Sequence, residues 1–221
     1  IYKNINGTWT KLGSDIQGEK DGDNSGRSVS LSSDGNVVAI GAILHEASGN
    51  ATGNVRIYKN INDTWTQIGS DIDGEDANSF SGRSVSLSSD GNVVAIGADW
   101  NDGNGPDSGH VRIYENVNNN WTQVGSDIDG EAAGDRSGWA VSLSADGSVV
   151  AIGAPYNDGN GRTDSGHVRI YKNVDDVWTQ VGSDIDGEGF SDSSGVSVSL
   201  SSDGSVIAVG APFSDKNGTD S

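Results

Sequence analysis

One phrase of sequence recurs four times along this 221-residue chain and accounts for almost all of it. An Ile-Tyr pair marks each copy, and its isoleucines are Ile1, Ile57, Ile113 and Ile170. Those positions are 56, 56 and 57 residues apart. A fixed period of this kind indicates a solenoid, a propeller or an array of small modules. We expect one repeat domain over 1–221, with units at approximately 1–54, 55–110, 111–167 and 168–221.

Each unit contains four strand signals separated by turn signals, and the third unit shows them clearly. Apolar and polar residues alternate over 110–115, and further strand candidates follow at 121–125, 139–144 and 149–154. The dipeptide Asp-Gly at 146–147 is typical of a tight hairpin. The last candidate is apolar on both faces, as expected of a strand that lies between neighbouring sheets. No window has a helical period of useful length.

Four short antiparallel strands per unit are typical of a propeller blade. We therefore predict an all-β fold of four-stranded antiparallel blades, arranged either in a ring or as part of a larger propeller or array. The sequence has no Met and its ends fall inside a unit, which favours an excerpt of a longer tandem run. Repeated aromatic residues are expected to pack between blades, namely Tyr2, Trp9, Tyr58, Trp65, Tyr114, Trp121, Tyr171 and Trp178.

The charge of the chain restricts its partners. The formal net charge is −19, so the clustered Lys and Arg needed for nucleic-acid binding are missing. No apolar run is long enough for a transmembrane helix, and we expect no membrane insertion in this segment. Cysteine is absent, which excludes disulfides and thiol catalysis. The acidic residues either form a solvated coat or hold calcium.

Two segments of the third unit carry a family resemblance. Residues 135–147 read DRSGWAVSLSADG and residues 149–155 read VVAIGAP. This order resembles the FG-GAP repeat family, which includes the blades of the integrin alpha propeller and many secreted or surface proteins. Parts of the pattern recur at 23–26, 80–82 and 192–195. The resemblance implies a β-propeller architecture and specifies no activity.

The chain departs from the family pattern in two ways. The Gly-Ala-Pro ending is kept at 153–155 and 210–212, but it reads Gly-Ala-Ile at 41–43 and Gly-Ala-Asp at 97–99. Integrin-type blades also carry an Asp-x-Asp-x-Asp-Gly calcium loop between strands. The equivalent hairpins here are Ser-Asp-Gly-Asn or Ala-Asp-Gly-Ser, which are too short and offer too few oxygens. Calcium binding of that type is therefore not expected at these hairpins.

Two other groups of loops are rich in oxygen ligands, which calcium prefers. The first is Asp99, Asn101, Asp102, Asn104 and Asp107, echoed by Asn157, Asp158, Asn160 and Asp164. The second is Asp127, Asp129, Glu131 and Asp135, with copies at Asp71, Asp73, Glu75, Asp184, Asp186 and Glu188, and a weaker version at Asp15, Gln17 and Glu19. The alternative is that these residues only make turns and solvate a blade rim.

Catalytic signals are weak. The histidines are His45, His110 and His167, and the last two occupy the same position in successive units. Copies on different blades are poor candidates for one shared base or metal cluster. No carboxylate pair is distinguished from its copies, and no phosphate-binding loop or nucleophile elbow is visible. We expect no enzymatic activity and no certain cofactor, with calcium as the one candidate.

Five Asn-x-Ser/Thr sequons suggest a secreted glycoprotein, since such acceptors belong in exposed turns. Their asparagines are Asn6, Asn50, Asn62, Asn120 and Asn217. We therefore expect an extracellular structural or adhesive protein whose partners are further repeats, other copies, or an extracellular protein or glycan. The alternative is a calcium-dependent module that recognises carbohydrate or protein.

Overall fold

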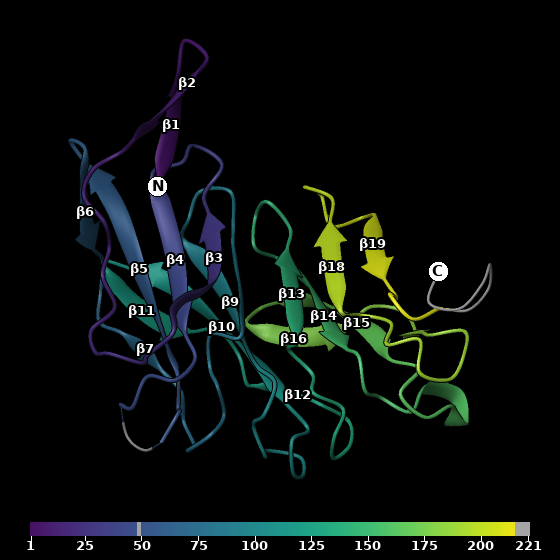
Figure 1. Ribbon diagram of the computed structural model, residues 1–221. Coiled ribbons are helices and arrows are strands. Elements are labelled where there is room, and N and C mark those ends of the chain that lie inside the picture. Colours follow the sequence, from purple (N-terminus) through teal and green to yellow (C-terminus); the bar gives the residue numbers. More distant parts are fainter. Residues whose placement is uncertain (48–49, 215–221) are drawn as a thin grey trace.

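The protein is built almost entirely from β-strands, and the computed structural model describes residues 1–47 and 50–214 (Figure 1). Three complete sheets follow one another along the chain. The first contains β3 (Ser25–Leu31), β4 (Val37–Ala42), β5 (Asn54–Ile61), β6 (Thr64–Gln67) and β7 (Ile72–Asp73). The second contains β8 (Ser84–Leu87), β9 (Val93–Ala98), β10 (His110–Val117), β11 (Asn120–Gln123) and β12 (Ile128–Asp129). The third contains β13 (Ala140–Leu143), β14 (Val149–Ala154), β15 (His167–Val174), β16 (Val177–Gln180) and β17 (Ile185–Asp186).

Two smaller sheets lie beside the complete ones. They pair β1 (Tyr2–Ile5) with β2 (Thr8–Lys11), and β18 (Ser197–Leu200) with β19 (Ile207–Gly210). One 3₁₀ turn, η1 (Gly159–Gly161), interrupts the loop between β14 and β15. All strand pairs within the sheets are antiparallel, so the predicted all-β fold with four-stranded antiparallel sheets is confirmed. The short fifth segments β7, β12 and β17 were not predicted.

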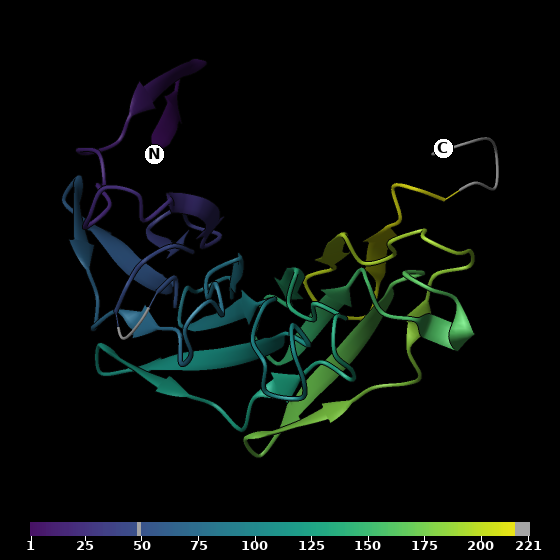
Figure 2. The same ribbon diagram turned by 60° about the horizontal axis from the view of Figure 1, so that its bottom comes forward.

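The sheets recur along the chain at the same spacing as the sequence units, but a sheet does not begin and end where a unit does. Each complete sheet combines the last two strands of one unit with the first two strands of the next. Figure 2 shows the sheets following an open arc, with the two marked chain ends at opposite ends of that arc. Among residues 1–47 and 50–214, the pair β1–β2 and the pair β18–β19 remain separate sheets, so the arc is not closed into a ring.

The innermost strands β3, β8, β13 and β18 lie side by side, and serine side chains link them. The Ser30 hydroxyl accepts a hydrogen bond from the Leu87 N–H at 2.9 Å, and Ser86 does the same for Leu143 at 3.0 Å. Serine is short enough to bond to the backbone of the adjacent strand, and the repeated serines therefore link these neighbouring strands.

The turns follow from local chemistry. In the hairpin between β8 and β9, the Ser88 hydroxyl donates to Asp90 Oδ1 at 2.6 Å, and the Asn92 N–H donates to the same oxygen at 3.0 Å. In the hairpin between β10 and β11, Asn118 and Asn119 have φ angles of 55° and 64°. Asparagine tolerates this left-handed region better than most residues, and two such residues in succession make a turn that matches strand twist.

We call the contacts that the complete sheets make with one another and with β1–β2 seams. The first seam joins β1–β2 to the first complete sheet, the second joins the first and second complete sheets, and the third joins the second and third. The pair β18–β19 also packs on the third complete sheet, where the Leu200 N–H donates to the Ser142 hydroxyl at 3.0 Å, but this contact is not counted as a seam. A buried cluster fills the second seam, with Val55 and Ile57 from one side and Val94 and Ile96 from the other. A similar cluster fills the third seam. The core therefore lies between the sheets, as face-to-face blades require.

Aromatic residues pack in these seams as predicted in most units. Tyr114 belongs to the second-seam cluster with Trp121 against it, and Tyr171 and Trp178 pack against the third-seam cluster. The prediction is wrong for Tyr2 and Trp9, which are 62% and 68% exposed. Each seam tryptophan packs on the sheet before its own, and the described residues place no sheet before β1–β2.

Gly97 shows how closely the sheets approach. A Cβ atom at this position would lie 2.0 Å from the carbonyl oxygen of Gly138 in the next sheet. No larger residue fits without moving that backbone, which explains the glycine within the apolar phrase of β9. Among the described residues, no helix has the length and apolar character needed to cross a membrane.

Candidate functional site

The acidic loops that follow β6, β11 and β16 meet a neighbouring acidic loop at each seam. Within the described residues, three clusters of one histidine and two carboxylates arise in this way, each with ligand atoms within 4.8 Å of one another. The clusters are Glu19, His45 and Asp71 at the first seam, Glu75, His110 and Asp127 at the second, and Glu131, His167 and Asp184 at the third. The glutamate comes from the loop of one sheet and the aspartate from the loop of the next.

At the third seam, His167 lies at the start of β15 and is only 1% exposed. Its Nδ1 atom is 3.7 Å from Glu131 Oε2 and 3.8 Å from Asp184 Oδ2. Neither ring nitrogen has a hydrogen-bond partner. Gln180 holds Asp184 through a 2.6 Å hydrogen bond to Oδ1, and Arg169 Nη1 lies 3.7 Å from Glu131 Oε1. The two carboxylates are therefore fixed on their outer sides and face the imidazole with their other oxygens.

The second seam repeats this arrangement. His110 Nδ1 is 3.5 Å from Asp127 Oδ2, and Glu75 Oε1 is 3.2 Å from Arg112 Nη1. Burial lowers the pKa of His110 to about 4, and the nearby Arg112 guanidinium acts in the same direction. Burial also raises the pKa of Glu75. The imidazole is consequently neutral near pH 7, with one ring nitrogen free of its proton.

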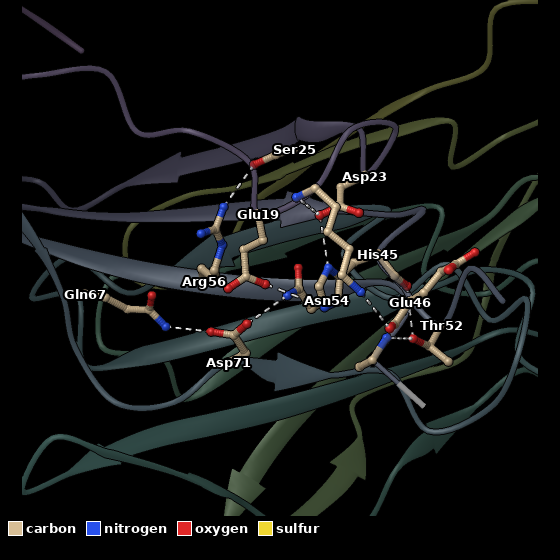
Figure 3. A network of polar contacts seen from close by, with 12 residues as sticks. Glu19, Asp23, Ser25, His45, Glu46, Thr52, Asn54, Arg56, Gln67 and Asp71 are labelled. Carbon is tan, nitrogen blue, oxygen red and sulfur yellow. Dashed lines mark hydrogen bonds and ion pairs between the residues drawn. The ribbon is translucent and has the colours of Figure 1, made fainter. Parts of the chain in front are cut away.

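The first seam keeps the two carboxylates but takes its histidine from another place (Figure 3). Asn54 stands at the repeat position of His110 and His167, and its amide donates to Asp71 Oδ2 at 3.1 Å. His45 comes instead from the loop after β4, with Nε2 3.6 Å from Glu19 Oε2. Its Nδ1 atom lies 3.1 Å from Asp23 Oδ2. An imidazole is thus present at each of these seams although its sequence position changes.

A cavity of about 640 Å³ opens beside the third cluster. Both groups of acidic loops line it, with Asp158 and Asn160 from one loop and Glu131, Asp184 and Asp186 from the others. The Asn160 amide donates a hydrogen bond to Asp186. The structure therefore brings together two loop groups that the sequence presented as separate candidates. The equivalent loops of the preceding unit also meet, but through the backbone, since Asn104 Nδ2 donates to the Gly130 carbonyl at 2.9 Å.

Several predicted ligand residues do not point into a shared site. Asp99 is buried with its Oδ2 3.7 Å from Arg83 Nε, and Asn101 Oδ1 accepts from the Gly103 N–H within its own loop. Asp102 likewise accepts from the Asp107 N–H. Asp135 accepts from the Asn157 amide at 2.8 Å. Asp73, Asp129 and Glu188 are exposed and belong to none of the three clusters found among the described residues.

From the sequence alone, two copied histidines are poor candidates for one shared site. One sequence signal does point to the clusters, since both copies are followed seventeen residues later by an aspartate that is also copied. Seeing them as one cluster per seam requires knowing which loops are adjacent. In the short hairpin between β8 and β9, both oxygens of Asp90 accept hydrogen bonds within their own turn.

Four of the five sequon asparagines lie on exposed positions of the described chain, at Asn6, Asn50, Asn62 and Asn120. Asn6 and Asn62 occupy hairpin turns with φ angles of 52° and 51°. Asn120 begins β11. Asn217 lies outside the described residues.

The segment from the turn after β11 into β15 matches a known sequence family. Residues 126–171 are an FG-GAP repeat. This FG-GAP segment includes the residues whose order suggested the resemblance, and it contains Glu131 and His167 but ends before Asp184. The third cluster therefore extends beyond one FG-GAP repeat into the following loop. No curated protein is similar enough to the whole chain to count as a match.

Solved structures share the architecture that contains the FG-GAP segment. A candidate 6-phosphogluconolactonase from Bacteroides uniformis aligns with a TM-score of 0.57 and 15% identity, covering 85% of this chain and 48% of its own. One from Bacteroides fragilis aligns with a TM-score of 0.51 and 14% identity, covering 82% and 40%. Saccharomyces cerevisiae Sqt1 aligns with a TM-score of 0.48 and 14% identity, covering 72% and 35%. The chain spans less than half the length of these proteins, and the first two show a propeller-like fold alone.

Proposed function

We propose that this chain is a segment of an extracellular structural or adhesive protein that has no enzymatic activity of its own. One observation carries the proposal: the arginine and tryptophan hydrogen bonds that join neighbouring sheets recur at all three seams. Arg56, Arg112 and Arg169 each donate to a carbonyl oxygen of the preceding loop, at 2.7, 2.7 and 2.6 Å. Repeated seams give a scaffold in which each module supports the next.

The polar features support a scaffold rather than a catalyst. The 640 Å³ cavity is lined by residues such as Asp158, Asn160 and Glu131 that have counterparts in the preceding unit. An adhesive array gains strength because equivalent weak sites act together, and the second contact is then effectively intramolecular. The negative charge of −19 keeps such an array soluble while it presents its edges to partners.

The extracellular part of the proposal is supported by the exposed sequons. Expression in a glycosylating eukaryotic host should give glycans at Asn6 and Asn62, whose turns are accessible. Peptide mapping before and after enzymatic deglycosylation measures this. A chain secreted without glycan at either site would argue against the extracellular assignment.

Bead adhesion tests the adhesive role. Beads coated with increasing densities of the folded chain are mixed with beads that carry the same chain or extracellular-matrix glycoproteins. Adhesion should rise more steeply than in proportion to coating density, because several repeats engage at once. Beads coated with heat-unfolded chain are the control. Absence of adhesion at every density, together with turnover of lactones or glycosides by the free chain, would overturn the proposal.

A second candidate function is the recognition of carbohydrate or protein, and one aromatic cluster favours it. Arg136 lies over the Trp100 ring at 4.0 Å, and Arg83 lies over the Trp139 ring at 3.8 Å. Tyr156 meets Trp139 edge to face at 5.8 Å. Partly exposed aromatic rings with fixed cations offer both stacking and polar contacts to a ligand.

One repeat position holds Arg27, Arg83, Trp139 and Val196 in successive units, so only one unit has a tryptophan there. The aromatic cluster is therefore not copied in every unit. A glycan array probed with the chain and with Trp139→Ala tests it, and repeating the array with a chelator tests calcium dependence. Selective binding that is lost in the variant would favour recognition over a purely structural role.

A further inference from the structure

The three histidine–carboxylate clusters consist of the same chemical groups, one imidazole and two carboxylates. Each cluster takes its groups from separate segments that meet only when neighbouring sheets pack. The glutamate and aspartate are retained at all three seams. The imidazole is also retained, although His45 comes from a different sequence position from His110 and His167.

The environment of His167 in the third cluster is unusual for a buried polar side chain. His167 is 1% exposed, yet neither ring nitrogen has a hydrogen-bond partner. Buried polar groups in folded proteins are nearly always paired, because an unpaired one costs stability. Its Nδ1 atom points between Glu131 and Asp184, at 3.7 and 3.8 Å from their nearest oxygens. These contacts are too long for good hydrogen bonds.

The distances from His167 Nδ1 to the two carboxylates fit ligands of one metal ion better than direct hydrogen bonds. Zinc lies about 2.0–2.2 Å from nitrogen and oxygen ligands, so two ligand atoms of a tetrahedral site are about 3.4 Å apart. The observed separations of 3.7 and 3.8 Å exceed this by a few tenths of an ångström. Direct hydrogen bonds would need a separation of about 2.9 Å. A shift of these ligand atoms by less than a bond length would therefore bring them to the separation of a tetrahedral zinc site.

The donor set indicates the class of ion. Calcium takes six to eight oxygen ligands, whereas imidazole favours first-row transition metals. Two carboxylates supply two negative charges, which match the charge of a divalent cation, and Arg169 next to Glu131 offsets one of them. Gln180 bonded to Asp184 and Arg169 beside Glu131 are the outer partners that orient metal ligands.

We propose that Glu131, His167 and Asp184 bind a divalent transition-metal ion such as Zn²⁺ across the third seam, and that Glu75, His110 and Asp127 bind a second ion across the second seam. Each ion ties the loop of one sheet to the next sheet. The adjoining cavity gives water access to the open coordination position at the third seam. At the first seam His45 is bonded to Asp23, and we assign no ion there. This inference does not depend on the adhesive role.

The test is Zn²⁺ binding by the tag-free chain, measured by native mass spectrometry and by calorimetry against a competing chelator. The wild-type chain should bind two Zn²⁺ ions. His167→Asn should bind one, with affinity at the third seam reduced at least about 100-fold, since even outer partners are worth about 10–100-fold. Asn54 already occupies the equivalent position, so this variant should fold. Circular dichroism checks that it does.

Asp164→Asn is the matched control. It removes one carboxylate from the lining of the same cavity but touches no member of the cluster, so Zn²⁺ stoichiometry should stay at two. X-ray absorption of the Zn²⁺-loaded chain should show nitrogen and oxygen ligands with an imidazole contribution. No Zn²⁺ binding, equal binding by wild type and His167→Asn, or binding of Ca²⁺ in place of Zn²⁺ would each overturn the proposal.

Discussion

The indole N–H of Trp121 donates a hydrogen bond to the carbonyl oxygen of Ile68 at 2.9 Å, and this bond joins the second complete sheet to the first. The same bond links Trp178 to Val124 and Trp65 to Leu12, also at 2.9 Å. Each seam therefore has one aromatic residue that fills space and satisfies a carbonyl of the neighbouring sheet. Stability should depend on this contact at every seam.

Trp121→Phe tests the contribution of that hydrogen bond. The phenyl ring keeps much of the apolar contact but leaves the Ile68 carbonyl without its donor. We expect a loss of about 1–3 kcal/mol in the free energy of unfolding, measured by urea denaturation. Trp9→Phe is the control, because Trp9 is 68% exposed and should change stability little. Equal losses in the two variants would contradict the assigned role.

Gly69→Ala tests the close contact between the Gly69 backbone and the Trp121 ring. Gly69 has a φ of +74°, and a Cβ there would lie 2.7 Å from Trp121 Cδ1. Both the left-handed backbone and the collision should destabilise the fold, by about 1–3 kcal/mol in thermal or chemical unfolding.

Gly182→Ala separates the two causes. Gly182 stands at the equivalent position with a φ of +77°, but nothing lies within 4 Å of its added Cβ. It should show only the backbone cost. If Gly182→Ala were as harmful as Gly69→Ala, the collision with Trp121 would contribute nothing.

Asp90→Ala tests the hairpin between β8 and β9. The variant removes the acceptor for the Ser88 hydroxyl and for the Asn92 N–H. We expect a loss of about 1–2 kcal/mol, by analogy with the removal of a helix cap, which deletes a similar side-chain acceptor. Asp90→Asn retains one oxygen acceptor and should lose less. Denaturant midpoints of the two variants decide the comparison, and identical midpoints would show that the side-chain oxygens are not what holds the turn.

The strands were predictable because their signals are local. The 149–154 candidate coincides with β14, and the 110–115 candidate falls within β10. Apolar spacing and Asp-Gly turns act over a few residues, so a single unit contains the whole signal. Which strands share a sheet was harder to predict, because the pairing between β4 and β5 crosses the boundary between units.

For the same reason, the sequence identified the acidic residues of the candidate site but not their arrangement around the histidine. Glu131 and Asp184 could be selected as oxygen ligands from the loop sequence. That they lie on either side of His167 depends on the packing of one sheet against the next. The sequence contains no local record of that contact. The exposed rings of Tyr2 and Trp9 show the converse, since nearly identical local sequence gives a different environment when the adjoining sheet differs.

Asp99→Asn tests a pH dependence that arises from burial. Asp99 is 1% exposed, neither carboxylate oxygen has a hydrogen-bond partner, and Arg83 lies 3.7 Å away. Burial raises the pKa of Asp99 to about 6, although Arg83 and Arg136 oppose the shift. The folded protein therefore binds a proton at Asp99 more tightly than the unfolded chain does, whose aspartates have a pKa of about 3.9.

The sign of the effect follows from this difference. The favourable contribution of the protonated carboxyl is fully present below about pH 4 and is lost as the pH rises through about 6. Asparagine cannot ionise, so stability of the wild type relative to Asp99→Asn should fall by up to about 3 kcal/mol between pH 4 and pH 7. Urea midpoints across this range measure it. Parallel curves for the two proteins would mean that the pKa of Asp99 is the same in the folded and unfolded states, with Arg83 and Arg136 fully offsetting the effect of burial.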